Sequence, residues 1–459
     1  MTNPQDSNKL HIAMYPWFAL GHMTPYLHLA NQLAERGHKI SLILPTKTRT
    51  RLNHLNLHPN LITFIPIEVP HVEGLPLGTE TTTEIPHNYV PHLINARDLT
   101  QPQIEALLIT LMPNFIFFDF LNWIPALARG LGIKSIFYMA ISASVNAYYN
   151  VPARKGHEHE EAKVIQHPSG FPPSPIRVHP YQIRPLLDFP KSYENAVKPM
   201  LECDALAFRT CREVEGPYCD YLMEQYGKPI LLTGPVMQYG LPEASSQVLG
   251  DQFWSKWLSG FKPNSVVYCA FGSECILEKD QFQELVLGLE LTGFPFLVAL
   301  KPPSGAKTIE EALPDGFKER IEGRGMVHDG WVPQTKILKN PAIGCFVSHC
   351  GFGSMWEALI SNCQIVFCPH FLDQFLMTDV LVGGLKVAVD VERSEENGWF
   401  KRESVCKAVK LAMDEENKIG REVMANHAKL RDFLVDASAQ SSYVDEFVKE
   451  LQQLAVAAK

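Results

Sequence analysis

The sequence predicts an α/β protein with two doubly wound domains, and three observations lead to this fold class. A strand–helix–strand pattern opens the chain at His11, the same alternation resumes after residue 252, and turn formers with small polar residues occupy the stretch between. The chain has 459 residues, of which 46% are hydrophobic and 20% charged, so it can bury two large cores. This composition excludes a disordered, collagen-like or coiled-coil protein.

The first domain, expected over residues 1–238, contains two copies of the unit from which parallel sheets are built. In the first copy, a loop with His22 leads into a helix whose expected N-cap is Thr24, with Pro25 at its first position. The two copies supply four expected strands: 11–17, 38–45, 115–120 and 133–138. Two Pro- and His-rich stretches are predicted to be irregular loops with a functional role: 66–100 and 151–190.

A linker is expected over residues 239–252, followed by the second doubly wound domain over residues 253–435. Short apolar runs predict the strands of this domain: 265–273, 294–300, 342–350, 364–369 and 386–391. The charged sequence beyond residue 402 predicts helices. We expect the last of them, over residues 436–459, to pack back on the N-terminal domain.

Charge and cysteine content narrow the class of protein further. The chain has 41 Lys and Arg against 50 Asp and Glu, a net charge of −9, so no basic field attracts nucleic acid or anionic lipid. Its ten cysteines are scattered without a CxxC pair, and its first residues are polar, unlike a signal peptide. No apolar run reaches the ~18 residues of a membrane span. These features predict a cytoplasmic protein that is not inserted into a membrane.

Several generic motifs are missing, which weighs against other enzyme classes. The sequence has no GxxxxGK[ST] phosphate loop and no GxSxG nucleophile turn. The stretch from Gly351 begins like a dinucleotide-binding GxGxxG, but Trp356 stands at the third glycine position, which disfavours a dehydrogenase. Cys345, His349 and Cys350 fall on one expected strand with no second ligand pair, so we expect no metal site.

The segment from Trp331 to Gln374 is the most informative part of the chain. It places SHCGFGS between a buried strand and an amphipathic helix, where backbone N–H groups can bind phosphate without Lys or Arg. His349 can donate to a phosphate oxygen, and Ser354 can both cap the helix and donate. Glu357 can accept from ribose hydroxyls, Trp331 offers a flat face for a base, and Asp373–Gln374 can bind sugar hydroxyls. The alternative is a simple strand-to-helix turn with Trp331 in the core.

This segment resembles the donor-binding signature of plant family-one UDP-sugar-dependent glycosyltransferases, at the same length and without a gap. The matching positions are Trp331, Pro333, Gln334, Leu338, Gly344, Phe346, Ser348, His349, Cys350, Gly351, Ser354, Glu357, Pro369, Asp373 and Gln374. The resemblance extends to PWFALGHMTP, FFDF and YCAFGS. It implies the GT-B architecture, with two facing Rossmann-like domains, the donor in the C-terminal one and the acceptor mainly in the N-terminal one. The donor-binding residues that it implies are Ser273, Trp331, Val332, Gln334, His349, Gly351, Gly353, Ser354, Glu357, Asp373 and Gln374.

The chain departs from this signature at a few positions. Phe352–Gly353 replaces a usual Trp-Asn, which removes one side-chain contact to phosphate, and Asn340, Asn362 and Gln364 replace a usual His, Gly and Pro. The combination GFGSMWEAL and NCQIVF is similar to the branch that adds a second sugar to a flavonoid or anthocyanin glucoside. That resemblance implies transfer to the 2''-hydroxyl of a 3-O-glucoside. Gln374 is the family's usual residue for UDP-glucose, without excluding xylose, galactose or rhamnose donors.

His22 and Asp119 are the candidate catalytic residues. Each closely follows an expected parallel strand, and the carboxyl ends of such strands share one edge of the sheet, so the two side chains can meet. A neutral imidazole can take the proton of an attacking hydroxyl near pH 7, and a carboxylate on its far nitrogen fixes the tautomer. The resemblance assigns the same roles. We hypothesise a single inverting displacement that requires no cofactor and no metal.

The acceptor and the partners are less constrained by the sequence. Aromatic residues near the expected sheet edge are candidates to contact a flat polyphenol, although such residues are more often core: Trp17, Phe18, Phe120, Trp123, Tyr138, Tyr148 and Tyr149. We expect a monomer whose partners are small molecules, a UDP-sugar and a flavonoid-type acceptor. Two alternatives stay open: transfer to an aglycone or other small plant metabolite, and a non-catalytic sugar-nucleotide-binding protein of the same fold.

Overall fold

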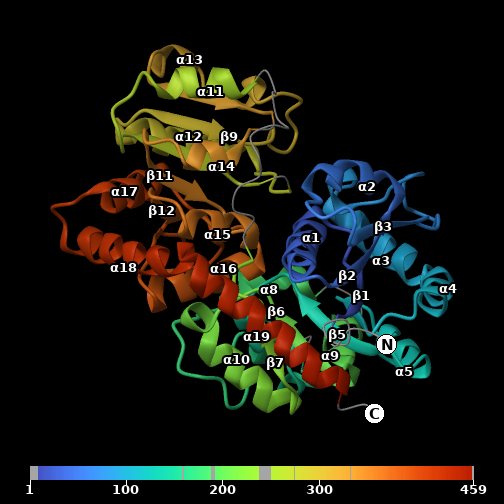
Figure 1. Ribbon diagram of the computed structural model, residues 1–459. Helices are drawn as coiled ribbons and strands as arrows, with labels where there is room; N and C mark the ends of the chain where they lie inside the picture. Colours follow the sequence, from blue (N-terminus) through green and yellow to red (C-terminus); the bar gives the residue numbers. More distant parts are fainter. Residues whose placement is uncertain are drawn as a thin grey trace. The chain divides into compact units, whose positions relative to one another are not determined.

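The computed structural model describes residues 9–157, 160–187, 192–236, 250–272, 274–330 and 332–456. Contacts divide the chain into two compact units, and Figure 1 labels many of their strands and helices. Unit 1 comprises Met1–Pro172, Leu186–Glu243 and Ala437–Lys459, and unit 2 comprises Pro173–Pro185 and Ala244–Asp436. Each unit contains a parallel sheet with helices, which confirms the predicted fold class.

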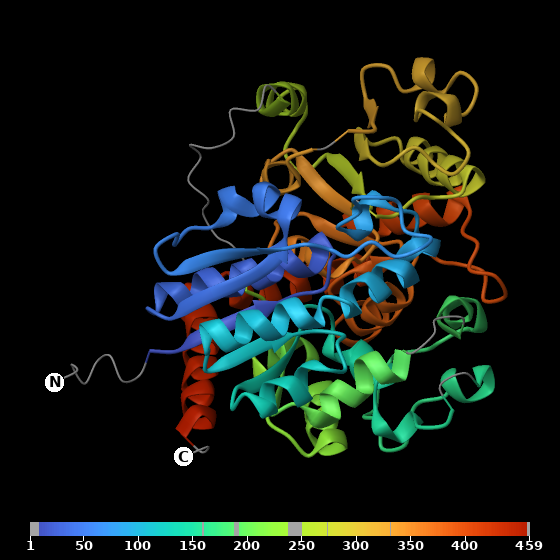
Figure 2. The same ribbon diagram turned by 90° about the vertical axis from the view of Figure 1, so that its right-hand side faces the viewer.

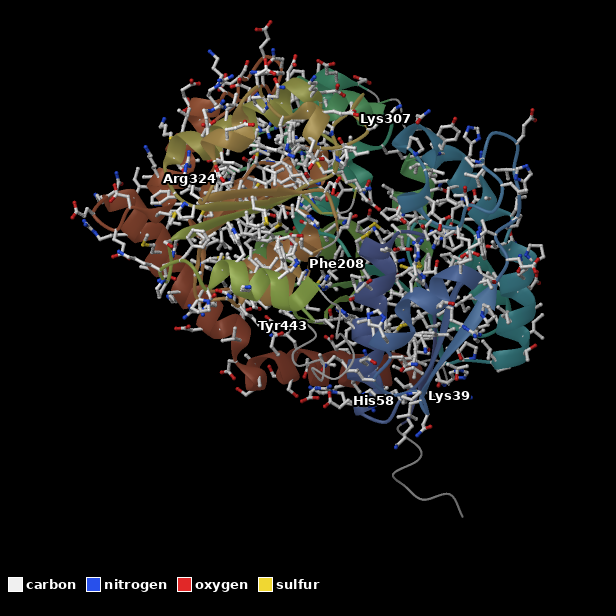
Figure 3. All side chains as sticks on the ribbon, turned by 90° about the horizontal axis from the view of Figure 1, so that it is seen from above. Lys39, His58, Phe208, Lys307, Arg324 and Tyr443 are labelled. Carbon is white, nitrogen blue, oxygen red and sulfur yellow. The ribbon has the colours of Figure 1, made fainter. Side chains whose placement is uncertain are left out.

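Within the described residues, the sheet of unit 1 has seven parallel strands in the order β3-β2-β1-β4-β5-β6-β7. The central strands are buried along nearly their whole length, as expected of a parallel sheet covered on both faces. Lys39 and His58, labelled in Figure 3, lie at the edge where β2 and β3 begin. The strands are β1 (His11–Tyr15), β2 (Lys39–Pro45), β3 (Ile62–Ile67), β4 (Phe115–Phe118), β5 (Lys134–Met139), β6 (Ala205–Phe208) and β7 (Ile230–Leu232).

Helices of unit 1 pack against this sheet, among them α1, α2, α5, α10 and α19. The helices are α1 (Leu20–Glu35), α2 (Thr46–Leu52), α3 (Val90–Asp98), α4 (Gln101–Leu111), α5 (Ile124–Gly130), α6 (Ala143–Tyr149), α7 (Glu161–Val164), α9 (Ser192–Glu202), α10 (Arg212–Tyr226) and α19 (Ala437–Val456). The start of α1 differs from the prediction, since Ala19 is the N-cap and Pro25 lies inside the helix. Met23 N donates to Ala19 O at 2.9 Å, so the first helical hydrogen bond lies ahead of Pro25 in the chain. Pro25 has no N–H group and removes only one later hydrogen bond of the helix. His22 therefore belongs to the first turn of α1.

Part of the expected irregular sequence is helical. Helix α3 lies within 66–100, and α8 (Pro180–Leu187) lies within 151–190. Leu93, Ala96 and Arg97 of α3 are buried, so this helix contributes to the interior of unit 1. Prolines near the starts of both helices disguise them in the sequence, because proline is compatible with a first helical turn.

The sheet of unit 2 has six parallel strands among the described residues, in the order β10-β9-β8-β11-β12-β13. They are β8 (Val266–Ala270), β9 (Phe296–Ala299), β10 (Gly325–His328), β11 (Ile343–Ser348), β12 (Gln364–Phe367) and β13 (Val389–Asp390). The helices, with one π-helical turn, are α11 (Gly250–Leu258), α12 (Lys279–Thr292), α13 (Phe317–Arg320), α14 (Gln334–Leu338), α15 (Phe352–Leu359), α16 (Leu372–Asp379), η7 (Val380–Gly384), α17 (Arg402–Met413) and α18 (Lys418–Val435).

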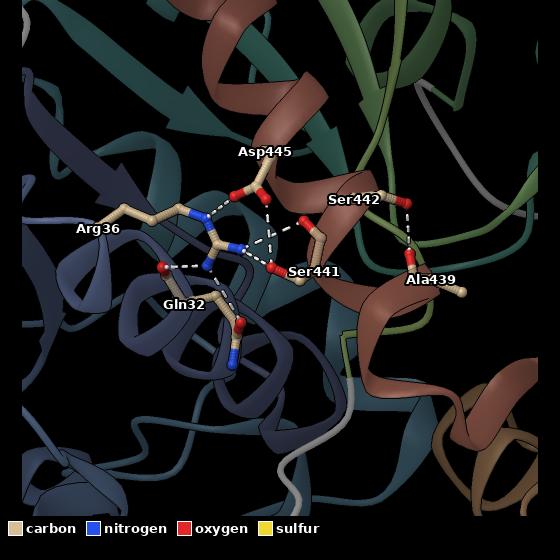
Figure 4. A network of polar contacts seen from close by, with 6 residues as sticks. All are labelled: Gln32, Arg36, Ala439, Ser441, Ser442 and Asp445. Carbon is tan, nitrogen blue, oxygen red and sulfur yellow. Dashed lines mark hydrogen bonds and ion pairs between the residues drawn. The ribbon is translucent and has the colours of Figure 1, made fainter.

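Helix α19 lies in unit 1, beside α1 and β7 (Figures 1 and 2). Its Phe447 is fully buried, with its ring 6.0 Å from that of Phe117 in β4. Arg36, at the end of α1, donates to Asp445 at 2.6 Å and to Ser441 at 2.9 Å (Figure 4). Asp445 is 61% exposed, so this ion pair contributes little, and the buried apolar face holds the helix.

Two further findings concern the chain as a whole. Segment Pro173–Pro185 belongs to unit 2, where Arg177 N donates to Asp379 Oδ2 at 2.9 Å. Nothing in the sequence indicated this crossing. The described helices include none with the length and apolar character that a membrane span requires.

Candidate active site

In each sheet, the chain winds outward in both directions from one central pair of strands. These pairs are β1 and β4 in unit 1, and β8 and β11 in unit 2. Such a pair leaves a crevice outside the carboxyl ends of its strands, where ligands of α/β proteins bind. His22 and Asp119 follow β1 and β4, whereas His349 follows β11. His22 and Asp119 thus lie beside the central strand pair of unit 1, and His349 lies beside that of unit 2.

The structure brings His22 and Asp119 into contact. Nδ1 of His22 lies 2.6 Å from Oδ2 of Asp119. An ionised carboxylate can only accept, so Nδ1 carries the proton and Nε2 of the neutral ring is the acceptor. Asp119 is fully buried, while the His22 side chain is 12% exposed, so the imidazole can reach a ligand that its carboxylate partner cannot.

Backbone strain occurs directly beside both candidate clusters. Phe120, which follows Asp119, has φ +48°, and Cys350, which follows His349, has φ +61°. Non-glycine residues adopt this left-handed region at an energetic cost, and they do so disproportionately at functional sites. Both sharp turns occur just beyond a buried strand, so each redirects the chain at the end of its sheet.

Arg97 is a buried partner of this pair that sequence reasoning missed. It lies in the last turn of α3 and is 1% exposed. Its Nη2 donates to Oδ1 of Asp119 at 3.1 Å and to the Tyr15 carbonyl at 3.2 Å. Asp119 therefore accepts from a histidine on one oxygen and from a guanidinium on the other. No motif marks Arg97, because its significance depends on a carboxylate 22 positions away.

The loop after β11 packs His349 between two glycines. A Cβ atom at Gly351 would lie 2.3 Å from His349 Nε2, so this position has no room for a side chain unless the ring moves, and one at Gly272 would make a tight contact of 3.1 Å with the same ring. Burial lowers the pKa of His349 to about 4, which keeps the ring neutral near pH 7. Its Nδ1 is buried and has no hydrogen-bond partner among the described residues.

Helix α15 begins directly after this loop. Its N-cap is Gly351, so Ser354 is not the cap that the sequence predicted but lies in the first turn. The cap is a glycine because His349 occupies the space beside it. Gln334 at the start of α14 donates to Glu357 at 2.6 Å and to Ser354 at 3.2 Å. Tyr268 of β8 donates to the same amide at 3.2 Å, so one hydrogen-bond network orients three predicted donor residues.

The remaining predicted donor residues are less closely linked. Gln374 is buried, and its Oε1 accepts from His370 N and Phe371 N at 2.9 and 3.1 Å, which ties it to the start of α16. Asp373 and Val332 are partly exposed, and a Cβ atom at Gly353 would meet nothing within 4 Å. Two predicted donor residues lie outside the described residues: Ser273 and Trp331.

Comparisons with known proteins identify the family. Residues 266–416 match the family model described as UDP-glucoronosyl and UDP-glucosyl transferase. The chain is 50% identical to cyanidin 3-O-galactoside 2''-O-xylosyltransferase FGGT1 of Actinidia chinensis var. chinensis, over 97% of this chain and 98% of that protein. It is 48% identical to anthocyanidin 3-O-glucoside 2''-O-glucosyltransferase of Ipomoea nil, with the same coverage. This chain belongs to the UDP-glycosyltransferases.

Solved structures agree with the fold of this UDP-glycosyltransferase. Glycyrrhiza uralensis UGT73P12, complexed with glycyrrhetinic acid 3-O-monoglucuronide, superposes with a TM-score of 0.82 at 23% identity, over 98% of this chain and 97% of that one. Arabidopsis thaliana UGT89C1, complexed with UDP-L-rhamnose, gives a TM-score of 0.77 at 22% identity, over 97% and 99%. At these identities the likeness concerns the fold alone, and it agrees with the predicted GT-B class.

The predicted acceptor aromatics of the UDP-glycosyltransferase divide into two groups. Phe120 lies beside the candidate catalytic pair, with its ring 5.8 Å from His22, and Trp17 and Trp123 are also partly exposed. Phe18 and Tyr138 are fully buried, and Tyr138 packs against Tyr26 of α1 at 4.8 Å. The structure therefore places these two in the core, not on a surface that a ligand could contact. Tyr148 is likewise buried, against the partly exposed Tyr149.

Proposed function

We propose that this UDP-glycosyltransferase catalyses a single inverting displacement, in which an acceptor hydroxyl attacks C1 of the UDP-bound sugar. The observation that carries the proposal is the 2.6 Å contact between His22 Nδ1 and Asp119 Oδ2. His22 Nε2 takes the hydroxyl proton as the O–C1 bond forms, and the C1–O bond to UDP breaks with its electron pair on the β-phosphate. Asp119 stabilises the imidazolium that results.

The donor is held by the loop and helix after β11. The first amides of α15, the Ser354 hydroxyl and the neutral His349 ring donate to the diphosphate and meet the charge that develops as UDP departs. Glu357 accepts from the ribose, and Asp373 and Gln374 bind the sugar. From the family resemblance we add Trp331 for the uracil base and Ser273 for phosphate. Because donors and dipoles supply this stabilisation, the proposed reaction requires neither a metal ion nor a cofactor.

The acceptor that we propose is the 2''-hydroxyl of a flavonoid or anthocyanin 3-O-glycoside, with glucose as the favoured sugar. Similarity along nearly the whole chain to proteins named for 2''-O-transfer supports the acceptor class. Those names include both xylosyl and glucosyl transfer, so the choice of glucose depends on Gln374. Trp17, Phe120 and Trp123 remain the candidates for acceptor contacts.

The substrate proposal is tested by incubating the protein with UDP-glucose, UDP-xylose and UDP-rhamnose against flavonoid aglycones and their 3-O-glucosides, then measuring product masses. We expect a hexose to be added to the glucosides alone. Transfer to aglycones would instead support an aglycone-specific enzyme. Binding of UDP without transfer to any acceptor would favour a non-catalytic sugar-nucleotide-binding protein.

The role of His22 is tested by His22→Ala. We expect turnover to fall by ~10²–10⁴-fold, the contribution of a general base, with the affinity for UDP-glucose unchanged. His58→Ala is the matched control, because His58 precedes β3, whereas His22 follows the carboxyl end of β1, so the substitution should leave turnover unaffected. Near-normal turnover in His22→Ala would contradict the proposed mechanism.

We further propose that the enzyme acts as a monomer in the cytoplasm. All ten cysteines are free thiols, and nine of them are buried, which is consistent with a reducing compartment. Size-exclusion chromatography with light scattering tests the assembly state, and a dimer mass would contradict it.

A further inference from the structure

We propose that Arg97 is a positioning residue of this reaction, which keeps the His22 imidazole unprotonated and therefore able to act as a base. The inference rests on the proposed role of His22. Arg97 pairs with the carboxylate oxygen of Asp119 that does not contact His22, at 3.1 Å. Three side chains of unit 1 are thus linked in the order Arg97–Asp119–His22. They come from α3, the loop after β4 and α1.

The surroundings of Arg97 indicate that stability is not its main contribution. Its guanidinium carbon lies 5.0, 5.3 and 5.6 Å from the ring centroids of Tyr15, Trp17 and Phe18. Its Nε and Nη1 atoms are buried and have no hydrogen-bond partner within the described parts of the chain. Burying a charge with two nitrogen atoms that lack a hydrogen-bond partner is costly, and buried ion pairs are often no more stabilising than apolar side chains of similar volume. A residue that carries this cost is better explained by its effect on Asp119.

That effect follows from the charges. An unshared carboxylate 2.6 Å from an imidazole strongly favours the protonated ring. An imidazolium has no lone pair on Nε2 and cannot accept the hydroxyl proton. Arginine stays charged at all working pH values, so Arg97 places a permanent positive charge on the other side of Asp119. This charge disfavours a second positive charge nearby, and therefore disfavours protonation of His22. The carboxylate can then orient the ring without protonating it in advance.

Other ionisable groups around the three side chains do not supply this charge. Tyr15 of β1 and Tyr138 of β5 are buried, and burial raises the pKa of each phenol to about 12. Burial and the nearby Asp119 raise the pKa of Tyr26 of α1 well above its ordinary value. These three phenols are neutral at any assay pH. Asp98, next to Arg97 in α3, is negative and acts on Tyr15, so it cannot replace the guanidinium.

The experiment compares kcat/KM as a function of pH in the full-length enzyme and three variants. Arg97→Met removes the charge but keeps an apolar side chain, and we expect the acid limb of its profile to move up by about one pH unit. Arg97→Lys retains the charge and should keep the acid limb of the wild type. Arg154→Met is the matched control, because Arg154 is also a buried arginine of unit 1 and lies over the ring of Tyr148, yet it donates to the backbone carbonyls of Tyr148, Lys163 and Gln166. It should lower thermal stability without moving the limb.

Several outcomes overturn the proposal. A folded Arg97→Met enzyme, shown by a wild-type circular dichroism spectrum and by cooperative thermal unfolding of unit 1, would overturn the proposal if its acid limb coincided with that of the wild type. An equal shift of the acid limb in Arg154→Met would overturn it as well. If Arg97→Met does not fold, the pH profile of the wild-type kcat/KM tests the proposal. An acid limb above about pH 7 would mean that His22 is protonated despite Arg97, which overturns the proposal. An acid limb below about pH 7 supports it. His22→Ala distinguishes the role of His22 from the role of Arg97. Full activity of His22→Ala would refute the proposal that His22 is the base. An inactive His22→Ala together with an unmoved acid limb in Arg97→Met would refute only the role of Arg97.

Discussion

Asp119 is the residue on which the unit 1 cluster depends, because it accepts from both His22 and Arg97. Asp119→Asn keeps the shape of the side chain but removes its charge and turns an N–H group toward one of its two donors. We expect kcat to fall by at least ~10²-fold, because the ring loses its tautomer and the stabilisation of its imidazolium. Initial rates with saturating UDP-glucose test this, and calorimetry should show unchanged UDP-glucose affinity. A large loss of that affinity with normal kcat would contradict the role of Asp119.

His427 provides a second prediction at the scale of one residue. It is 2% exposed in α18, its Nε2 donates to Leu359 O at 3.1 Å, and burial lowers its pKa from 6.5 to about 4. Between these values the unfolded chain binds a proton that the folded chain does not. The contribution of His427 to stability is therefore complete above pH 6.5 and is lost as the pH falls toward 4.

His427→Gln removes this dependence. We expect the variant to be less stable than the wild type at pH 7.5, and the difference in free energy of unfolding to shrink by about 2 kcal/mol at pH 5. Urea unfolding of both proteins at the two pH values measures the difference. The other buried histidines are present in both proteins, so their titration cancels. A difference that stays constant with pH would contradict the burial effect.

At the scale of elements, the start of α15 offers a matched pair of glycines. A Cβ atom at Gly351 would collide with His349 Nε2 at 2.3 Å, whereas one at Gly353 would meet nothing within 4 Å. Gly351→Ala should displace His349 and weaken UDP-glucose binding by ~10-fold or more, the loss of at least one charge-assisted hydrogen bond. Gly353→Ala should leave binding intact and stabilise the helix by about 0.5–1 kcal/mol. Equal effects of the two substitutions on Kd, measured by calorimetry, would contradict this account.

Which elements the sequence predicts depends on how deeply they are buried. The central strands β1, β4, β8 and β11 are short apolar runs, and the sequence predicts all four. It misses β3 and β10, each at one edge of its sheet, because ITFIPI includes Pro66 and GMVH is only partly buried. It also misses β6, whose four residues are too few to show a pattern.

The site is predictable where residues follow strands and unpredictable where they meet across the fold. The shared edge of parallel strands was enough to pair His22 with Asp119, although 97 positions separate them. Arg97 could not be found in this way, because a buried charge is recognised only by the partner that the folded chain gives it. The burial of Phe18 and Tyr138 was equally hidden, since an aromatic side chain has the same sequence signature in a core as in a binding site.

For the whole molecule, the two units should respond differently to changes in α19. Phe447→Ala empties a fully buried position of unit 1 and should cost about 3–5 kcal/mol, whereas Asp445→Ala breaks an exposed ion pair worth below about 1 kcal/mol. Thermal unfolding with and without UDP-glucose should identify the transition of unit 2, where we propose that the donor binds, because a ligand stabilises the state that it binds. Phe447→Ala should lower only the other transition. An equal shift of both would show that the units unfold together.

The path of the chain also restricts how such enzymes can be recombined. Pro173–Pro185 belongs to unit 2, and the chain from Ala437 onward belongs to unit 1. In a chimera with a single junction near residue 244, segment 173–185 would come from the first parent but belong to unit 2 of the second parent. Helix α19 would come from the second parent but belong to unit 1 of the first. A swap that retains native packing must exchange 173–185 together with 244–436, and leave α19 with the parent that supplies β1 to β7.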